Sequence, residues 1–142
     1  MLLAAAVAAV PVQLTFMTAA STTSVKAGQT LRLFVDVTPR AKMHVYAPGA
    51  KDYQPIALEL NSPGVRAGKL TYPKSEDWYF EPTKEHVPVY QAPFRLTQDV
   101  TVDPAVKPGT FYVTGVLKYQ ACDDTICYKP VSEPVAWTLS VN

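Results

Sequence analysis

The sequence has little of the material that several classes of protein need. Its 142 residues include only two cysteines and two histidines, and the formal net charge is +1. A chain so close to neutral offers no basic surface for nucleic acid or for an anionic membrane, so both partners are disfavoured. His44 and His86 show no metal-ligand spacing, which leaves a thiolate-based metal site as a minor alternative and predicts no cofactor. The sequence also shows no serine, histidine and carboxylate arrangement for hydrolysis.

Sustained helical periodicity is lacking as well. Apolar residues instead alternate with polar ones in short runs, separated by turn signals such as Pro48-Gly49 and Pro108-Gly109. We expect strands near 12–16, 31–37, 43–46, 56–60, 94–102, 110–120 and 135–141. Seven to nine short strands in a chain that is 48% apolar predict one all-β domain, an immunoglobulin-like β-sandwich.

The first twelve residues are apolar but too few to span a membrane, which takes about 20 residues. They are rich in alanine, and Ala6-Val7-Ala8 matches the small-residue pattern of a signal-peptide cleavage site, although no basic residue precedes it. We interpret 1–12 as the remnant of an export signal, with a buried first strand as the alternative, and 13–142 as the domain. Export would place the cysteines in an oxidising compartment.

The two cysteines, Cys122 and Cys127, are five positions apart at the end of the run 110–120. If residues 123–126 form a hairpin loop, the cysteines lie opposite each other on an antiparallel ladder, where Cα atoms are roughly 4.5–5.5 Å apart. That separation falls within the roughly 4.4–6.8 Å that a disulfide requires. The spacing therefore predicts a local disulfide that closes without moving the backbone.

Such a bond could be a structural staple or a redox-active pair. Closing a loop of about six residues stabilises a fold by only about 2 kcal/mol, whereas a local bridge can open and close while the domain stays folded. Strand alternation places Cys122 on the mixed face of its strand, away from the apolar stripe, which predicts an accessible sulfur. Asp123 and Asp124 disfavour a thiolate there, and Lys118 and Lys129 favour one.

Residues 72–86 are charged and carry three consecutive aromatic residues, Trp78, Tyr79 and Phe80. We interpret this segment as a loop, because three adjacent rings cannot all point into one core, and we expect at least one ring to be exposed or folded over another group. Either Trp78 or Phe80 closes the end of the sandwich, or the segment covers a reactive group or forms a binding surface.

Several segments, in this order, resemble a known family. They are 43–49, 70–73, 87–90 and 119–122, followed by Cys127, and the likeness extends over roughly 25–142. They resemble the N-terminal periplasmic domain of the thiol:disulfide interchange protein DsbD, also called the disulfide bond corrector family. The resemblance implies an immunoglobulin-like fold. It covers one domain, so we expect either a fragment of a larger membrane protein or a free-standing copy.

The resemblance implies a periplasmic electron relay, connected with cytochrome c biogenesis. Cys122 and Cys127 would exchange disulfides with thioredoxin-fold partners, either a disulfide isomerase or a thioredoxin-like donor or acceptor. An aromatic cap would shield the pair, and Trp78, Tyr79 and Phe80 occupy the corresponding stretch. The other residues near the pair would be His44, Tyr46, Tyr119, Gln120, Asp123 and Tyr128, with His44 standing where an aromatic hydroxyl is more usual. The alternative is a secreted binding or assembly module with a purely structural disulfide.

Overall fold

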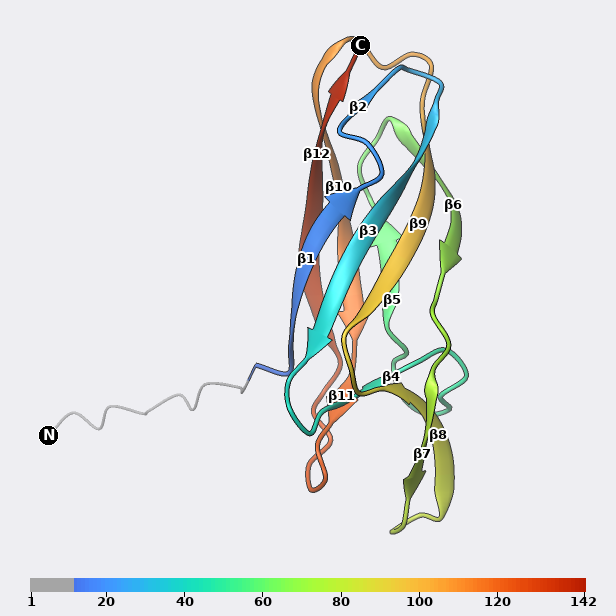
Figure 1. Ribbon diagram of the computed structural model, residues 1–142, viewed down its shortest axis with the longest axis vertical. Helices are drawn as coiled ribbons and strands as arrows, with labels where there is room; N and C mark the ends of the chain where they lie inside the picture. Colours follow the sequence, from blue (N-terminus) through green and yellow to red (C-terminus); the bar gives the residue numbers. More distant parts are fainter. Residues whose placement is uncertain (1–11) are drawn as a thin grey trace, which may run out of the picture.

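The computed structural model describes residues 12–142, so nearly all of the expected export signal lies outside the described residues. The described chain forms twelve strands and no helix, and therefore contains no helix long and apolar enough to cross a membrane (Figure 1). The strands are β1 (Leu14–Ala20), β2 (Ser24–Val25), β3 (Thr30–Pro39), β4 (His44–Tyr46), β5 (Ala57–Leu60), β6 (Val65–Thr71), β7 (Glu76–Phe80), β8 (Glu85–Tyr90), β9 (Phe94–Val102), β10 (Gly109–Tyr119), β11 (Ala121–Cys122) and β12 (Val131–Val141).

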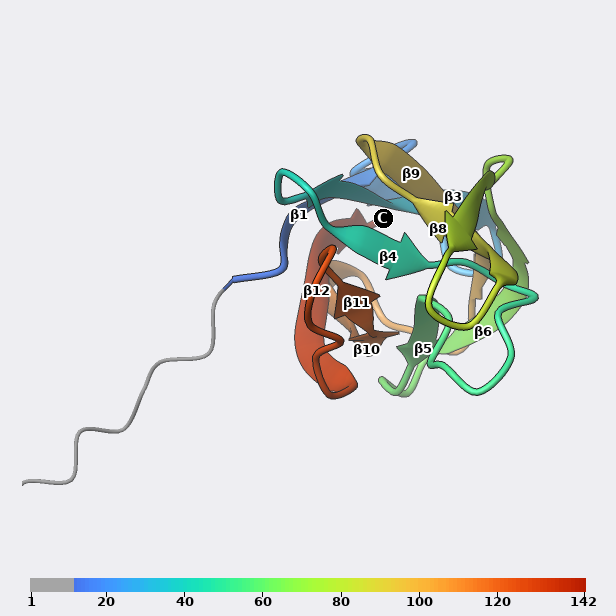
Figure 2. The ribbon, with the colours of Figure 1, turned by 90° about the horizontal axis from the view of Figure 1, so that it is seen from below.

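Two four-stranded sheets face each other and enclose the main core (Figure 2). One has the order β1-β3-β9-β6 and the other β2-β12-β10-β5. Alternate residues point inward, as the sequence pattern requires: Leu33 and Val35 of β3 meet Trp137 and Leu139 of β12 in one buried cluster. The predicted all-β sandwich is confirmed.

The longest hairpin joins β10 to β12 and sets the position of the cysteines. Its strands pair without interruption from Gly109 opposite Val141 to Tyr119 opposite Val131. On its other side β10 pairs with β5, and a Cβ atom at Gly115 would lie 2.6 Å from the Glu59 carbonyl oxygen, so this close approach requires glycine. The cysteines lie in the connection at one end of this rigid hairpin.

A third sheet, β11-β4-β8-β7, lies at that same end of the molecule (Figure 1). The pairing with β12 ends at Tyr119, and the next strand, β11, pairs with β4 instead. In this pairing Cys122 lies opposite His44. All three residues of β4 are buried, but they face two ways: Val45 belongs to the main core, whereas Tyr46 belongs to a separate cluster with Cys122. The short strand β4 therefore separates the core from the cystine.

The expectation of a loop at 72–86 is wrong where β7 and the start of β8 form, at 76–80 and 85–86. β7 and β8 form an antiparallel hairpin, with Glu76 opposite Val89 and Phe80 opposite Glu85. The three adjacent rings fit an extended strand because its side chains alternate: Trp78 and Phe80 are half-buried on one face, and Tyr79 is 43% exposed on the other. The expectation that at least one ring is exposed is confirmed.

Candidate functional site

Cys122 and Cys127 are joined by a disulfide, and their Cα atoms are 4.0 Å apart. They form an antiparallel bridge between two backbone hydrogen bonds, from Asp123 N to Ile126 O (2.9 Å) and from Tyr128 N to Ala121 O (3.0 Å). This is the non-hydrogen-bonded position of a ladder, where opposed side chains come closest. The predicted pairing across a tight hairpin is confirmed.

Asp123 holds the turn of this cystine loop, residues 122–127. Its Oδ1 accepts hydrogen bonds from the backbone amides of Thr125 (2.8 Å) and Ile126 (2.7 Å), and its Oδ2 accepts one from the Tyr128 hydroxyl (3.2 Å). These bonds, the Thr125 amide first, lower the pKa of Asp123 to about 2. An aspartate that binds backbone amides two and three residues ahead is a common turn former, so this residue, placed near the pair from the sequence, shapes the loop.

The two halves of the disulfide differ in exposure. Cys122 is 0% exposed and lies in a small cluster with Tyr46, Val87 and Val89, whereas Cys127 is exposed. The prediction of an accessible Cys122 sulfur is therefore wrong. Strand alternation did place Cys122 outside the main core, but the sequence did not show that the third sheet covers that face.

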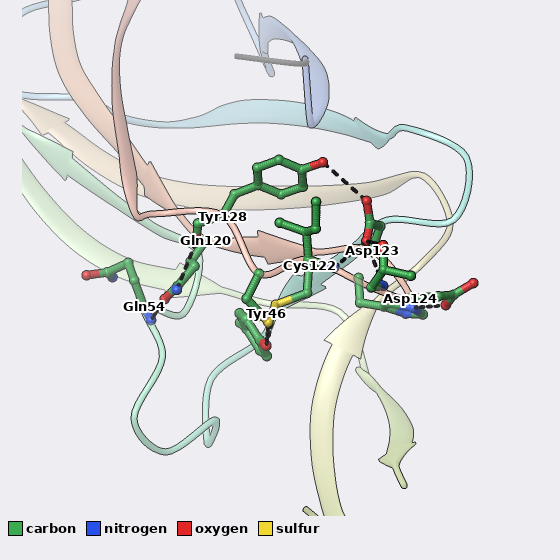
Figure 3. Close-up of a disulfide and its surroundings, with 11 residues drawn as sticks. Tyr46, Gln54, Gln120, Cys122, Asp123, Asp124 and Tyr128 are labelled. Atoms are coloured by element: carbon green, nitrogen blue, oxygen red, sulfur yellow. Dashed lines mark hydrogen bonds and ion pairs between the residues drawn. A yellow bond between two sulfur atoms is a disulfide. The ribbon is translucent and has the colours of Figure 1, made fainter. Parts of the chain in front are cut away.

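The Tyr46 hydroxyl lies against the disulfide, 2.8 Å from Cys122 Sγ and 3.7 Å from Cys127 Sγ (Figure 3). Its ring stacks on Tyr53 with centroids 4.1 Å apart, and the residue is only 1% exposed. Burial, and next the neighbouring Tyr53, raise the pKa of Tyr46. The phenol therefore stays protonated and can donate a hydrogen bond at any physiological pH.

His44 connects the cystine loop to the hairpin of β7 and β8, which carries the three aromatic residues. It stands opposite Cys122 in the ladder, its Nε2 lies 3.2 Å from Asp124 Oδ1, and its ring stacks on Trp78 with centroids 4.1 Å apart. Trp78 also packs on the cluster around Cys122 and touches Phe80, with ring centroids 5.2 Å apart. Tyr79, in contrast, contacts the His86 ring at 4.9 Å. Of the three candidate cap residues, Trp78 is thus the one that packs on this cluster.

Gln120 fixes the point where the chain changes its pairing partner. Its side-chain amide donates to the Tyr128 carbonyl (3.0 Å), and its side-chain oxygen accepts from the Gln54 backbone amide (2.8 Å) (Figure 3). Sequence reasoning missed Gln54 and Tyr53, because the segment that carries them shows no strand pattern.

Two other residues named from the sequence make contacts away from the disulfide. Tyr119 packs in the main core, and burial followed by Glu133 raises its pKa, so it supports the sandwich. Lys118 lies 2.9 Å from the Glu59 carboxylate on the opposite strand, so its charge is already paired. Within residues 12–142, no three His, Cys, Asp or Glu side chains gather in a way that could hold a metal ion.

The family model described as thiol:disulfide interchange protein DsbD, N-terminal, matches residues 12–138. The chain belongs to this family. Membership, together with the bonded cysteine pair, supports thiol–disulfide exchange at Cys122 and Cys127. No curated protein sequence matches the chain.

Two solved structures share the immunoglobulin-like fold of this chain. The Neisseria meningitidis DsbD N-terminal domain, in the reduced form, is 17% identical with a TM-score of 0.57, and the match covers 88% of this chain and 85% of that one. The N-terminal periplasmic domain of ScsB from Proteus mirabilis is 8% identical with a TM-score of 0.61, covering 90% of this chain. This chain spans 46% of the ScsB structure.

Proposed function

We propose that this DsbD-type domain relays reducing equivalents in the periplasm, by disulfide exchange between the Cys122–Cys127 pair and thioredoxin-fold proteins. The observation that carries the proposal is the asymmetry of the disulfide, with one cysteine exposed at a loop and the other covered. The periplasmic location is supported by the family and by the description of the ScsB domain as periplasmic.

The difference in exposure supports an order in which the two sulfurs react. In the reduced domain, the Cys127 thiolate attacks the partner's disulfide, forms a mixed disulfide and expels the partner's second sulfur as a thiolate. The Cys122 thiolate then attacks Cys127, which restores the Cys122–Cys127 bond and releases the partner as a dithiol. Two electrons and two protons pass to the partner, and a donor dithiol returns them through the reverse steps.

The surroundings of Cys127 suit a transient partner. Ile126, next to it in the cystine loop, has an exposed large aliphatic side chain, and exposed apolar groups of this kind commonly mark protein contacts. The bridge closes a loop of about six residues, so its contribution to stability is about 2 kcal/mol, and the sandwich does not depend on it. Trp78 is the proposed cap of the disulfide, because its ring packs on the cluster around Cys122.

The test mixes reduced single-cysteine variants with an oxidised thioredoxin that carries a Cys-x-x-Cys disulfide. Cys122→Ser should accumulate a mixed disulfide through Cys127, because the resolving thiol is missing. Cys127→Ser should form little, because its remaining thiol is covered. If neither variant forms the adduct, or if the wild-type disulfide has a reduction potential below about −300 mV, the bond is a structural one and the proposal is wrong.

A further inference from the structure

Within residues 12–142, the Tyr46 hydroxyl is the one side-chain group within hydrogen-bond distance of Cys122 Sγ. Neither sulfur of a disulfide carries a hydrogen, so the 2.8 Å contact has the tyrosine as donor. The distance to Cys127 Sγ is longer, 3.7 Å, so the bond favours the buried sulfur. The exposed sulfur is the one that an incoming thiol meets first.

We propose that Tyr46 is a catalytic residue of this exchange, whose hydroxyl stabilises the Cys122 sulfur as it leaves. When an incoming thiolate forms a bond to Cys127 Sγ, the bond between Cys127 and Cys122 breaks. The electron pair and the negative charge then move to Cys122 Sγ, where the O–H group already points. In the reverse direction, the same hydrogen bond stabilises the Cys122 thiolate, which attacks Cys127 in the mixed disulfide and expels the other sulfur. This inference rests on the proposed function.

A buried leaving group needs such a donor. Cys122 is 0% exposed, so water cannot solvate the charge that it gains, and an apolar cluster on its own would raise the thiol pKa. Of the charges that the sequence places near the pair, Asp123 and Asp124 are acidic, Lys118 is paired with Glu59, and Lys129 is exposed to solvent, where its charge is screened.

The hydroxyl is held in place before the reaction begins. The Tyr46 amide donates to the Gln120 carbonyl (3.1 Å), and its carbonyl accepts from the Ile56 amide (2.9 Å). The ring is fixed by its stack on Tyr53. A donor that is already aligned needs no reorganisation as charge develops, which is the condition under which a single hydrogen bond lowers a barrier most.

The experiment measures the rate at which dithiothreitol reduces the disulfide in wild type and in Tyr46→Phe, which keeps the ring and its stack but lacks the donor. We expect reduction to slow about 10- to 100-fold, the range for one hydrogen bond to a charged group. Tyr90→Phe is the matched control, because it removes another buried hydroxyl of the same sheet, one that donates to the Pro73 carbonyl (2.8 Å). Its rate should stay within about twofold of wild type, since its hydroxyl touches neither sulfur.

A second readout separates this function from simple support of the fold. In the Cys127→Ser background, Tyr46→Phe should raise the pKa of the Cys122 thiol, measured by thiolate absorbance. If Tyr46→Phe does not fold, 3-fluorotyrosine placed at position 46 makes the hydroxyl a stronger donor and should speed reduction. Unchanged rates, or an unchanged thiol pKa, would overturn the proposal. Because the probe is a small dithiol, this outcome does not depend on whether a thioredoxin-fold partner reacts.

Discussion

A Trp78→Ala substitution tests whether the indole ring controls access to Cys122. The ring stacks on His44 and packs on the cluster that contains Cys122, whereas Cys127 is exposed at the cystine loop. The substitution is made in the reduced single-cysteine variants, so that each thiol is followed on its own. We expect it to expose Cys122 and to leave Cys127 almost unaffected.

The size of the effect follows from the contacts of the ring. Complete burial of a large apolar side chain contributes about 1.5–3 kcal/mol, and Trp78 is half-buried, which gives about 1 kcal/mol. An aromatic stack adds about 0.5–1.5 kcal/mol. Together, about 2 kcal/mol hold the ring in place, which corresponds to a factor of about 30 in the population of the open state. Alkylation of Cys122 should therefore be about 30-fold faster in Trp78→Ala.

The assay is alkylation by iodoacetamide, followed by mass spectrometry at several times. Tyr79→Ala provides the matched control, because this neighbouring ring contacts His86 and is 43% exposed. It should change neither rate by more than about twofold, an effect below about 0.5 kcal/mol. The reasoning fails if the two alanine variants accelerate Cys122 equally, or if Cys122 and Cys127 already react at one rate when Trp78 is present.

Three further predictions concern the loop and the sandwich. The Asp123 carboxyl should titrate near pH 2 by NMR. Because its pKa is lowered in the folded state, its contribution to stability is complete above about pH 4 and is lost as the pH falls through about 2. A midpoint near pH 4 would contradict this prediction. Gly115→Ala should lower the free energy of unfolding by about 1–3 kcal/mol, measured by urea denaturation, since its Cβ meets the Glu59 carbonyl. Leu117→Ala, at a fully buried position, should cost about 2–5 kcal/mol in the same assay, and a smaller loss would mean that the core closes around the cavity.

The parts of the fold that the sequence predicts well are those where one face is buried and the other is exposed. β3 and β12 alternate strictly because each has a core face and a solvent face, and the pattern therefore identifies them. The opposition of the cysteines was also predictable, since a hairpin fixes the register of residues five apart through local geometry alone.

The third sheet was not predictable in the same way. Its central strand β4 has only three residues, all buried, so it shows no alternation, and it pairs with a strand almost eighty residues away. The hairpin of β7 and β8 was hidden for another reason: charged residues and three adjacent rings obscure its period of two. What covers Cys122 is a property of these distant pairings, so alternation along β10 could indicate its face but not its exposure.

Separation of the cystine from the core explains how one domain can combine a stable fold with a bond that opens. Cys122 shares its cluster with Tyr46, Val87 and Val89, while the main core lies on the other side of β4 around Val45. A change at the sulfurs therefore acts first on a few side chains of the third sheet. The ladder between β10 and β12 ends before the cysteines, so none of its hydrogen bonds has to break. In the proposed exchange, the hairpin of β10 and β12 would present the loop to a partner, and the change in the bond would act on the small cluster around Cys122.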